Sequence, residues 1–437
     1  MKHPIALLFM LMPMLQYGFA QTRIGTLDEA QNIAVRQNTS IQAAERSLDL
    51  SKTEERIAHG NLLPTVNFSA SGDYNYRMPV QLIPAVIFGG APGEYQEIQF
   101  GQPYVANMAI DLSMPLYAPD KWRARETARK MELQTGYQIE KQRETVKVAV
   151  IQAYFQNLLY QSVLLINEQQ VALSDSLKFV AEQKSANDIL SPADYNRVLN
   201  LVNTTQMAFE SNRTHYAQSV LALKQLLHLP FEEELVVENT LDLPQRSAIS
   251  TNASAAMQRP AYLAQAASAE TALSQLEEKQ AARLPKLSLN ARHTLQFQFD
   301  QPFSDNSSSN SFDFGSVGLS FQAPLFRGKT LALQSEKARV RHEQAMQETA
   351  QVLEQSRKEL LEWELYREEA FANAPSAKAN AERSVENVRI ALKRYEEGLS
   401  DLTEYFNVYG EYVQAQQTYL QTLMNANIYQ ALLELYK

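Results

Sequence analysis

The chain has 437 residues, a formal net charge of −9 and no cysteine. The acidic balance argues against nucleic acid or anionic lipid as the main partner, because both repel a negatively charged protein. The lack of cysteine excludes a disulfide framework, thiolate metal sites and a lipidated N-terminal cysteine. Glycine and proline are sparse, at 14 and 17 residues, so the composition favours a mainly helical protein.

Residues 1–20 have the pattern of a secretory signal peptide. Lys2 supplies the positive charge, IALLFMLMPML the apolar core and Gly18-Phe19-Ala20 a small-x-small cleavage site. A membrane anchor is the alternative, but the apolar run is too short to span a bilayer. Cleavage removes Lys2 and changes the net charge from −9 to −10. No later segment offers about 20 consecutive apolar residues, so we expect an exported chain without a transmembrane helix.

The remaining sequence is predicted to consist of two structural repeats, 21–245 and 246–437. Pro115 and Pro324 are 209 residues apart, as are Ser191 and Ser400, whereas Pro64 and Pro285 are 221 apart. The difference indicates an insert of 12 residues in the first repeat, and we place it within 79–101 as a loop. The similar segments are NLLPTVNFSA and AARLPKLSLN, LSMPLYAPDK and SFQAPLFRGK, and DILSPADY and GLSDLTEY.

Each repeat is expected to form a helix, two strands, a very long helix and a further helix. Thr26 and Glu29 suggest a capping box at the first helix. In the first repeat the predicted elements are a helix at 27–59, strands at 65–77 and 104–116, helices at 121–184 and 192–228, and an irregular linker at 229–245. In the second they are a helix at 253–282, strands at 286–300 and 313–325, and helices at 329–394 and 401–435. Four prolines mark the helix–strand junctions, since proline neither continues a helix nor sits within a ladder: Pro64, Pro115, Pro285 and Pro324.

All four predicted strands alternate apolar and polar residues, as in TVNFSASGDYNY at 65–76. An antiparallel sheet on a soluble core is one interpretation, but no amphipathic helix is left to cover it. Strand length and terminal aromatics match an outer-membrane barrel instead. We expect aromatic girdles of Tyr74, Tyr76, Phe297, Phe299, Phe312 and Phe314 at one rim, and of Tyr117, Trp122 and Phe326 at the other. His293 lies on the apolar face, and the sequence gives no reason for it.

Four strands do not close a barrel, and an open sheet edge in lipid is prohibitively costly. Two copies of the chain would supply 8 strands and three copies 12. An eight-stranded barrel is filled by its own side chains, whereas a larger one leaves a lumen. The polar face of the strands suits water, which favours three copies.

The helix predicted at 121–184 would be roughly 95 Å long, at 1.5 Å per residue, and needs packing partners along its whole length. Antiparallel neighbours across turns at 185–191 and 395–400 supply them. A membrane sheet that continues into such helices implies a hollow helical cylinder below the barrel. Two heptad seams are predicted: Tyr195, Leu199, Val202, Gln206, Phe209, Arg213, Tyr216, Val220, Leu223 and Leu227, and Leu402, Phe406, Tyr409, Val413, Gln416, Leu420 and Leu423.

Taken together, these features resemble the TolC-like outer-membrane efflux factors. The resemblance rests on the duplicated plan, the LP and PL junctions, the opening TLDEAQNIAVRQNTSIQAA and the motif YEEGLSDLTEYF from Tyr395. It implies a homotrimer in the outer membrane of a Gram-negative bacterium, with a 12-stranded barrel and a periplasmic tunnel of 12 helices. It also implies docking to a periplasmic adaptor (membrane fusion) protein and an inner-membrane RND or ABC pump.

The resemblance further implies that the periplasmic tip closes like an iris, with two rings of acidic side chains. The matching positions are Glu404 and Asn407, of which only the first keeps the charge. Three copies of Glu404 would form a ring that attracts cations. The alternative is that Glu404 is an ordinary solvated helix residue.

A tether at the tip is also implied by the resemblance, namely a Tyr–Asp hydrogen bond and an arginine contact to the neighbouring chain. Tyr395 and Asp194 match the first pair. Ser400 occupies the arginine position, so that lock is absent or has moved to Arg394. Gly398 fits a turn that requires positive φ.

Motifs of catalysis are missing from the sequence. The six histidines are scattered, HEQAM lacks the second histidine of a zincin, and there is no P-loop, GxSxG or GxGxxG. We therefore expect no enzyme, no cofactor and no metal site. The leading hypothesis is a passive, gated export duct of a tripartite efflux or type I secretion system, for drugs, metal ions or proteins. The alternative is a coiled-coil scaffold with a packed β-domain, and a porin is disfavoured because porins have no use for such long helices.

Overall fold

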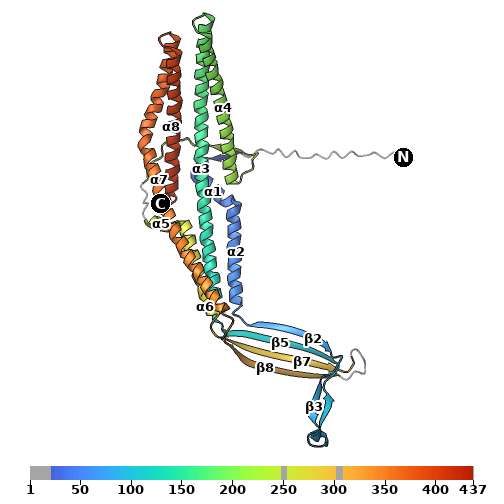
Figure 1. Ribbon diagram of the computed structural model, residues 1–437. Coiled ribbons are helices and arrows are strands. Elements are labelled where there is room, and N and C mark those ends of the chain that lie inside the picture. The colour runs from blue at the N-terminus through green and yellow to red at the C-terminus, as the bar shows by residue number, and fades with distance from the viewer. Residues whose placement is uncertain (1–20, 248–252, 302–308, 437) are drawn as a thin grey trace, which may run out of the picture. The chain divides into compact units, whose positions relative to one another are not determined.

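The computed structural model describes residues 21–247, 253–301 and 309–436 (Figure 1). The predicted signal peptide lies outside these residues. The predicted fold class is confirmed, because long helices dominate and a smaller part of the chain is rich in strands. The chain divides into two compact units: a helical unit (the chain up to Glu45, Tyr137–Leu263 and Gln351 onward) and a sheet unit (Arg46–Gly136 and Ala264–Ala350). The division of the sequence into repeats at 245 stays a prediction.

The helices follow the predicted pattern, with two additional breaks. Asn38 interrupts the first predicted helix, because its side-chain oxygen accepts hydrogen bonds from the backbone N–H groups of Ser40 and Ile41 and so caps a second helix. The second break follows Arg259, where Pro260 starts a new helix as its first residue, a position at which the missing N–H of proline is not needed. The helices are α1 (Leu27–Gln37), α2 (Thr39–Gly60), α3 (Pro119–Ala186), α4 (Pro192–Leu227), α5 (Ala253–Gln258), α6 (Pro260–Ala281), α7 (Thr330–Glu396) and α8 (Leu402–Glu434).

The core of the helical unit is formed around α3, with residues from α1, α4 and α8 packed against it. Contrary to the sequence-based expectation, α3 is long and apolar enough to cross a membrane, with a mean hydropathy of 1.2 over one 18-residue window. A buried core helix passes the same test, and Val150, Tyr154 and Leu158 of α3 are almost fully buried in this core. Burial therefore accounts for only part of the hydropathy of α3, since 39% of the apolar window is buried.

The predicted linker at 229–245 is more regular than expected. Its strand β6 (Glu234–Val237) pairs in parallel with β1 (Gln21–Ile24), and Ile24 is fully buried. The start of the described chain is thereby attached to the segment that joins the two predicted repeats.

The heptad seams are only partly as predicted. On α8 the buried positions include Leu402, Tyr409, Gln416, Leu420 and Leu423, as expected. On α4 the prediction is wrong in the middle, because Gln206 and Arg213 are exposed whereas Val198, Thr205 and Ser219 are buried. Small polar residues at the contact let the neighbouring helix approach closely, and a search for apolar residues overlooks them.

The sheet unit contains a four-stranded antiparallel sheet in the order β2-β5-β7-β8, formed by β2 (Thr65–Tyr74), β5 (Tyr104–Tyr117), β7 (Lys286–Phe299) and β8 (Ser309–Gln322) (Figure 1). β2 and β8 are its two edges and have no partner strand on their outer sides within the described chain. β8 begins four residues earlier and ends three residues earlier than predicted, and its N-terminal part was expected to be a loop.

The two faces of the sheet differ in polarity, as the alternation predicts. The register places Phe68, Ile110, His293 and Gly315 in one row across the four strands, on the apolar face. A Cβ atom on Gly315 would come within 3.2 Å of His293 Nδ1, so the glycine leaves room for the imidazole ring. This packing accounts for the histidine that the sequence left unexplained.

The predicted girdle needs one correction. Phe297 lies on the apolar face with Tyr74, but Phe312 and Phe314 lie on the opposite, polar face, because they pair with Gln296 and Thr294. A period of two residues fixes the face of every side chain in an unbroken strand, so these two phenylalanines do not belong to a lipid-facing girdle.

The predicted loop at 79–101 is also more regular than expected. It forms a two-stranded hairpin of β3 (Val80–Pro84) and β4 (Tyr95–Gln99), joined through the short 3-10 helix η1 (Ala85–Phe88). The insert in the first repeat is therefore a discrete structural element (Figure 1).

The four junction prolines take different places. Pro64 and Pro285 directly precede β2 and β7, and Pro324 follows β8. Pro115 lies within β5 instead of between two elements, at a shift in register next to Tyr117. A bulge accommodates a residue that has no N–H to give to the ladder.

Candidate functional site

The predicted gate residues lie at the ends of two helical hairpins in the helical unit. The α3–α4 turn contains Asp188 with φ 58°, and the α7–α8 turn contains Gly398 with φ 75°. Gly398 thus has the positive φ expected of it, which glycine adopts without steric cost. Ser191 and Asp401 then cap α4 and α8, since their side chains accept hydrogen bonds from the N–H groups of Asp194 and Glu404.

The two hairpin ends pack against each other through a cluster of aromatic side chains. Tyr395, Tyr405, Tyr409 and Tyr412, which we call the tyrosine cluster, are all buried in one hydrophobic core with residues of α3 and α4. The Tyr409 hydroxyl lies 3.2 Å from Thr205 Oγ1 across the helix interface. Burial raises the pKa of Tyr412 to about 12, with a smaller contribution from Tyr409, so these rings stay neutral far above neutral pH.

Lys184 joins the end of α3 to the end of α7. Its Nζ donates a hydrogen bond of 2.5 Å to the backbone oxygen of Tyr395 and lies 4.5 Å from the centroid of the Tyr395 ring. A lysine that combines a carbonyl hydrogen bond with a cation–π contact holds the two hairpins together at their ends. Sequence analysis missed Lys184, although its position in the last turn of a helix, where cations are favoured, was a usable signal.

The Tyr395–Asp194 hydrogen bond implied by the resemblance is not formed within the chain. Asp194 accepts a hydrogen bond of 2.8 Å from Ser191 and pairs with Arg197 at 3.4 Å. The buried Tyr395 hydroxyl has no hydrogen-bond partner among the described residues. Burial and, second, the charge of Asp194 raise the pKa of Tyr395, so the carboxylate acts on the hydroxyl without bonding to it.

Arg394 makes the ion pair that matters for the predicted acidic ring. Its Nη1 lies 3.1 Å from Glu404 Oε1, and both side chains are partly exposed. Asn407, one turn further along α8, is exposed. The predicted ring residue therefore carries a charge that is compensated within its own chain.

Three hydroxyl groups near the α7–α8 turn, those of Tyr395, Ser400 and Tyr405, are buried without a hydrogen-bond partner in the described part of the chain. An unsatisfied buried hydroxyl costs about 1–3 kcal/mol. In this conformation the α7–α8 turn therefore leaves more buried polar groups without a hydrogen bond than the α3–α4 turn does.

A second group of charged residues lies away from the hairpin ends, around Arg259 between α5 and α6. The Arg259 guanidinium is 6% exposed and bonds Glu144 at 2.8 Å and Glu359 at 2.7 Å. It also lies 5.3 Å from the ring centroid of Trp363 and 5.1 Å from that of Tyr436. We call these five residues the Arg259 cluster, and it ties α3, α7 and the end of α8 together.

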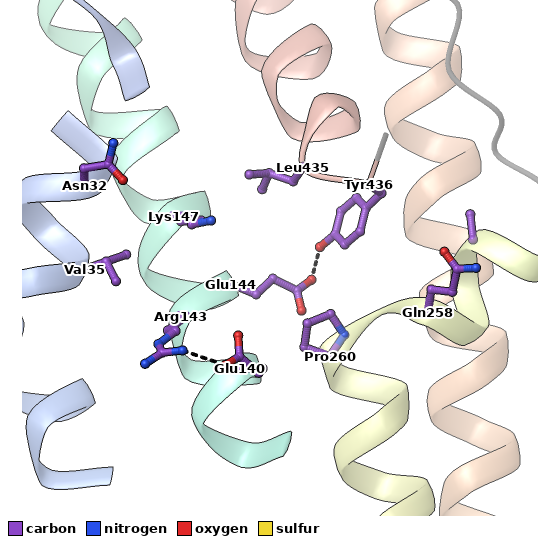
Figure 2. Close-up of a pocket in the computed structure, with 11 residues that line it drawn as sticks. Asn32, Val35, Glu140, Arg143, Glu144, Lys147, Gln258, Pro260, Leu435 and Tyr436 are labelled. Atoms are coloured by element: carbon purple, nitrogen blue, oxygen red, sulfur yellow. Dashed lines mark hydrogen bonds and ion pairs between the residues drawn. The ribbon is translucent and has the colours of Figure 1, made fainter. Parts of the chain in front are cut away.

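A pocket of about 500 Å³ adjoins this cluster (Figure 2). Figure 2 shows Glu144 of α3 pointing towards Tyr436, whose hydroxyl donates a hydrogen bond to it. Arg143 on the same wall pairs with Glu140 at 2.6 Å. Arg143 Nε and Glu144 Oε2 are nevertheless buried without a hydrogen-bond partner among the described residues, so the charges of this pocket are only partly compensated. Its lining, as far as the structure describes it, contains no serine, cysteine or histidine nucleophile.

No group of three or more histidine, cysteine, aspartate or glutamate side chains that could hold a metal ion occurs among the described residues.

Comparison with known proteins agrees with this arrangement. Residues 31–228 match the model of the family described as outer membrane efflux protein. The resemblance to TolC-like efflux factors is thereby confirmed, and so is the prediction that the chain is not an enzyme, because the family consists of channels.

Solved structures share the fold over nearly the whole chain. A membrane protein from Pseudomonas aeruginosa matches with a TM-score of 0.76 and 17% identity, over 93% of this chain and 92% of that one. The outer membrane channel CmeC of Campylobacter jejuni has a TM-score of 0.74 and 16% identity, over 94% and 85%. The outer membrane protein VceC of Vibrio cholerae has a TM-score of 0.74 and 15% identity, over 94% and 95%. No curated protein sequence matches the chain.

Proposed function

We propose that three copies of this chain form an outer-membrane exit duct, a passive and gated channel through which a Gram-negative cell exports cargo. The observation that supports it most directly is the four-stranded sheet. Its edge strands β2 and β8 have no outer partner within the described ranges, and its apolar face is exposed, with Phe68 and Phe321 both at 69%. In water such a face and such edges are unfavourable, whereas lipid covers the face and neighbouring copies pair the edges.

The direction of the strands suits this closure. Each neighbouring pair in the sheet is antiparallel, so β2 and β8 run in opposite directions. Joining β8 of one copy to β2 of the next continues the antiparallel order and gives 12 strands from three copies, with an even number as in bacterial outer-membrane barrels. The polar face then lines a lumen, and the long helices of the helical unit form the periplasmic tunnel.

The hairpin ends of the helical unit form the periplasmic gate in this proposal. Glu404 and Asn407 face the passage, and Arg394 balances the charge of Glu404 in the closed state. Lys184, bonded to Tyr395, replaces the tether that Ser400 no longer provides. The resemblance to TolC-like efflux factors supports this assignment, and the ion pair and the lysine contact supply its physical basis.

The exposed tips supply a docking surface for partners. Ile189 and Leu399 are 72% and 65% exposed at the two turns, so each tip presents a large apolar side chain to a partner. We assign this surface to a periplasmic adaptor protein that links the duct to an inner-membrane RND or ABC pump, in a tripartite efflux or type I secretion system.

Assembly and conductance test the duct. The mature chain purified in detergent should have the mass of a trimer and should form channels in planar lipid bilayers. A chain that is monodisperse and monomeric without detergent would refute the duct and favour a coiled-coil scaffold.

Ion selectivity tests the gate. Arg394→Ala should increase cation selectivity, because it exposes three uncompensated carboxylates, and Glu404→Gln should decrease it. Equal cation selectivity in both variants would show that Glu404 is not part of the gate.

A further inference from the structure

Two aromatic side chains interrupt the polar face of the sheet. Phe312 and Phe314 of β8 lie on that face, directly opposite Gln296 and Thr294 of β7. The next residue on this face of β8 is Ser316, and the rows of Phe312 and Phe314 end at Ser71 and Ser69 on β2. The face is otherwise almost entirely polar or small, so the pair stands alone near the end of the sheet where β8 begins.

The two phenylalanine rings are not used by the fold. They are 50% and 55% exposed, and neither makes a ring contact with an aromatic or cationic side chain in the described parts of the chain. Neighbouring polar groups bond to one another instead, as Gln296 does to Asn107 at 2.9 Å and Arg292 to Asp111 at 3.5 Å. The ring faces are therefore available to a ligand in the lumen.

Charge on the same face favours cations. Arg292 and Asp111 compensate each other, and Lys286 pairs with Asp120. Asp73 has no ion pair among the residues that the structure describes. It lies on the polar face of β2 opposite Val105, one row further out than the row that contains Phe312. Each copy thus contributes one uncompensated carboxylate and two aromatic rings to the outer half of the lumen.

We propose that Phe312 and Phe314 form a binding site for apolar organic cations near the outer exit of the duct. An aromatic ring attracts a cation through its negative face and also shields apolar groups from water, whereas small hydrated ions gain little from it. This site rests on the proposed trimeric duct. It identifies a class of cargo, whereas the gate residues do not distinguish one cargo from another.

Block of conductance by tetraphenylphosphonium is the test. The probe, added to the outer side of channels of the full chain in planar bilayers, should reduce the current of the wild type. The double variant Phe312→Leu/Phe314→Leu keeps the apolar volume but lacks the ring face, and its block should weaken by about tenfold or more. Phe312→Tyr/Phe314→Tyr keeps the ring face and should retain the block.

The matched control is Phe321→Leu, the same substitution on the apolar face of the same strand, which should leave the block unchanged. Detergent-solubilised trimer mass is measured for every variant, so that a loss of block in an intact trimer is separated from failed assembly. Wild-type channels that conduct but are not blocked, or a Leu double variant blocked as strongly as the wild type, would overturn the site and leave the duct standing. If the Leu double variant no longer assembles while the control does, the rings serve the seam between copies, and the binding site is wrong. A wild type without conductance would refute the duct itself.

Discussion

Removing Arg259 should destabilise the helical unit strongly. Its guanidinium is 6% exposed and its partner Glu144 is 10% exposed, so Arg259→Met leaves a buried carboxylate without its cation. Breaking such a pair costs about 3–5 kcal/mol. At roughly 2–4 °C per kcal/mol for a unit of this size, the midpoint of thermal unfolding should fall by on the order of 10 °C.

Trp363 provides the assay, because it lies against Arg259, and the chain has only two tryptophans. In a Trp122→Phe background, its fluorescence reports on the unfolding of this cluster alone. Arg357→Met is the matched control, since Arg357 pairs with Glu354 in an exposed position, where an ion pair contributes about 0–1 kcal/mol. If the midpoint of thermal unfolding falls equally for Arg259→Met and Arg357→Met, the cluster contributes no more to stability than a surface ion pair, and the reasoning is refuted.

Three further predictions concern the sheet, the tyrosine cluster and the hairpin ends. Leu319→Arg places a charge on the apolar face at a cost of about 2–4 kcal/mol near the midplane and should prevent membrane assembly, whereas Ser320→Arg on the polar face should assemble normally; detergent-resistant trimer in outer-membrane fractions is the readout. The pKa of Tyr412 is raised from 10.0 to about 12 in the fold, so the unfolded chain loses this proton first and stability should fall as the pH rises from 10 to 12; urea unfolding should show a smaller fall for Tyr412→Phe, and equal slopes would contradict it. Lys184→Met removes the contact between the two hairpins and should raise the open probability of single channels in planar bilayers, while unchanged gating would exclude this lysine from the closure.

Much of the local structure could be predicted from the sequence, because its causes are local. Period-two alternation marked the four strands, and capping residues such as Thr26 and a glycine such as Gly398 marked where helices begin or turn. The face on which Phe312 and Phe314 lie was also predictable, because both are an even number of residues from Ser316 and so share its polar face. They were assigned to a lipid-facing girdle because they are aromatic, without regard to this face.

The candidate site, by contrast, depends on contacts between residues that are far apart in the chain. Lys184 and Tyr395 are separated by 211 residues, and Arg394 meets Glu404 only because the α7–α8 turn folds back. No periodic pattern records which of several nearby cations will reach a given carboxylate, because that choice depends on helix register and on burial. The contact of Lys184 with Tyr395 was for this reason missed, and the tether of Tyr395, Asp194 and Ser400 stays a prediction.

The alternation of strands and very long helices, and the polarity of each face, follow from the amino-acid sequence alone, because propensities and periods act within single segments. Pairing becomes visible only in the folded chain: the order of the strands in the sheet, the lysine between the hairpins and the buried Arg259 cluster. Those contacts form where packing brings distant side chains within a few ångströms, and burial then determines which charges and hydroxyls need a partner.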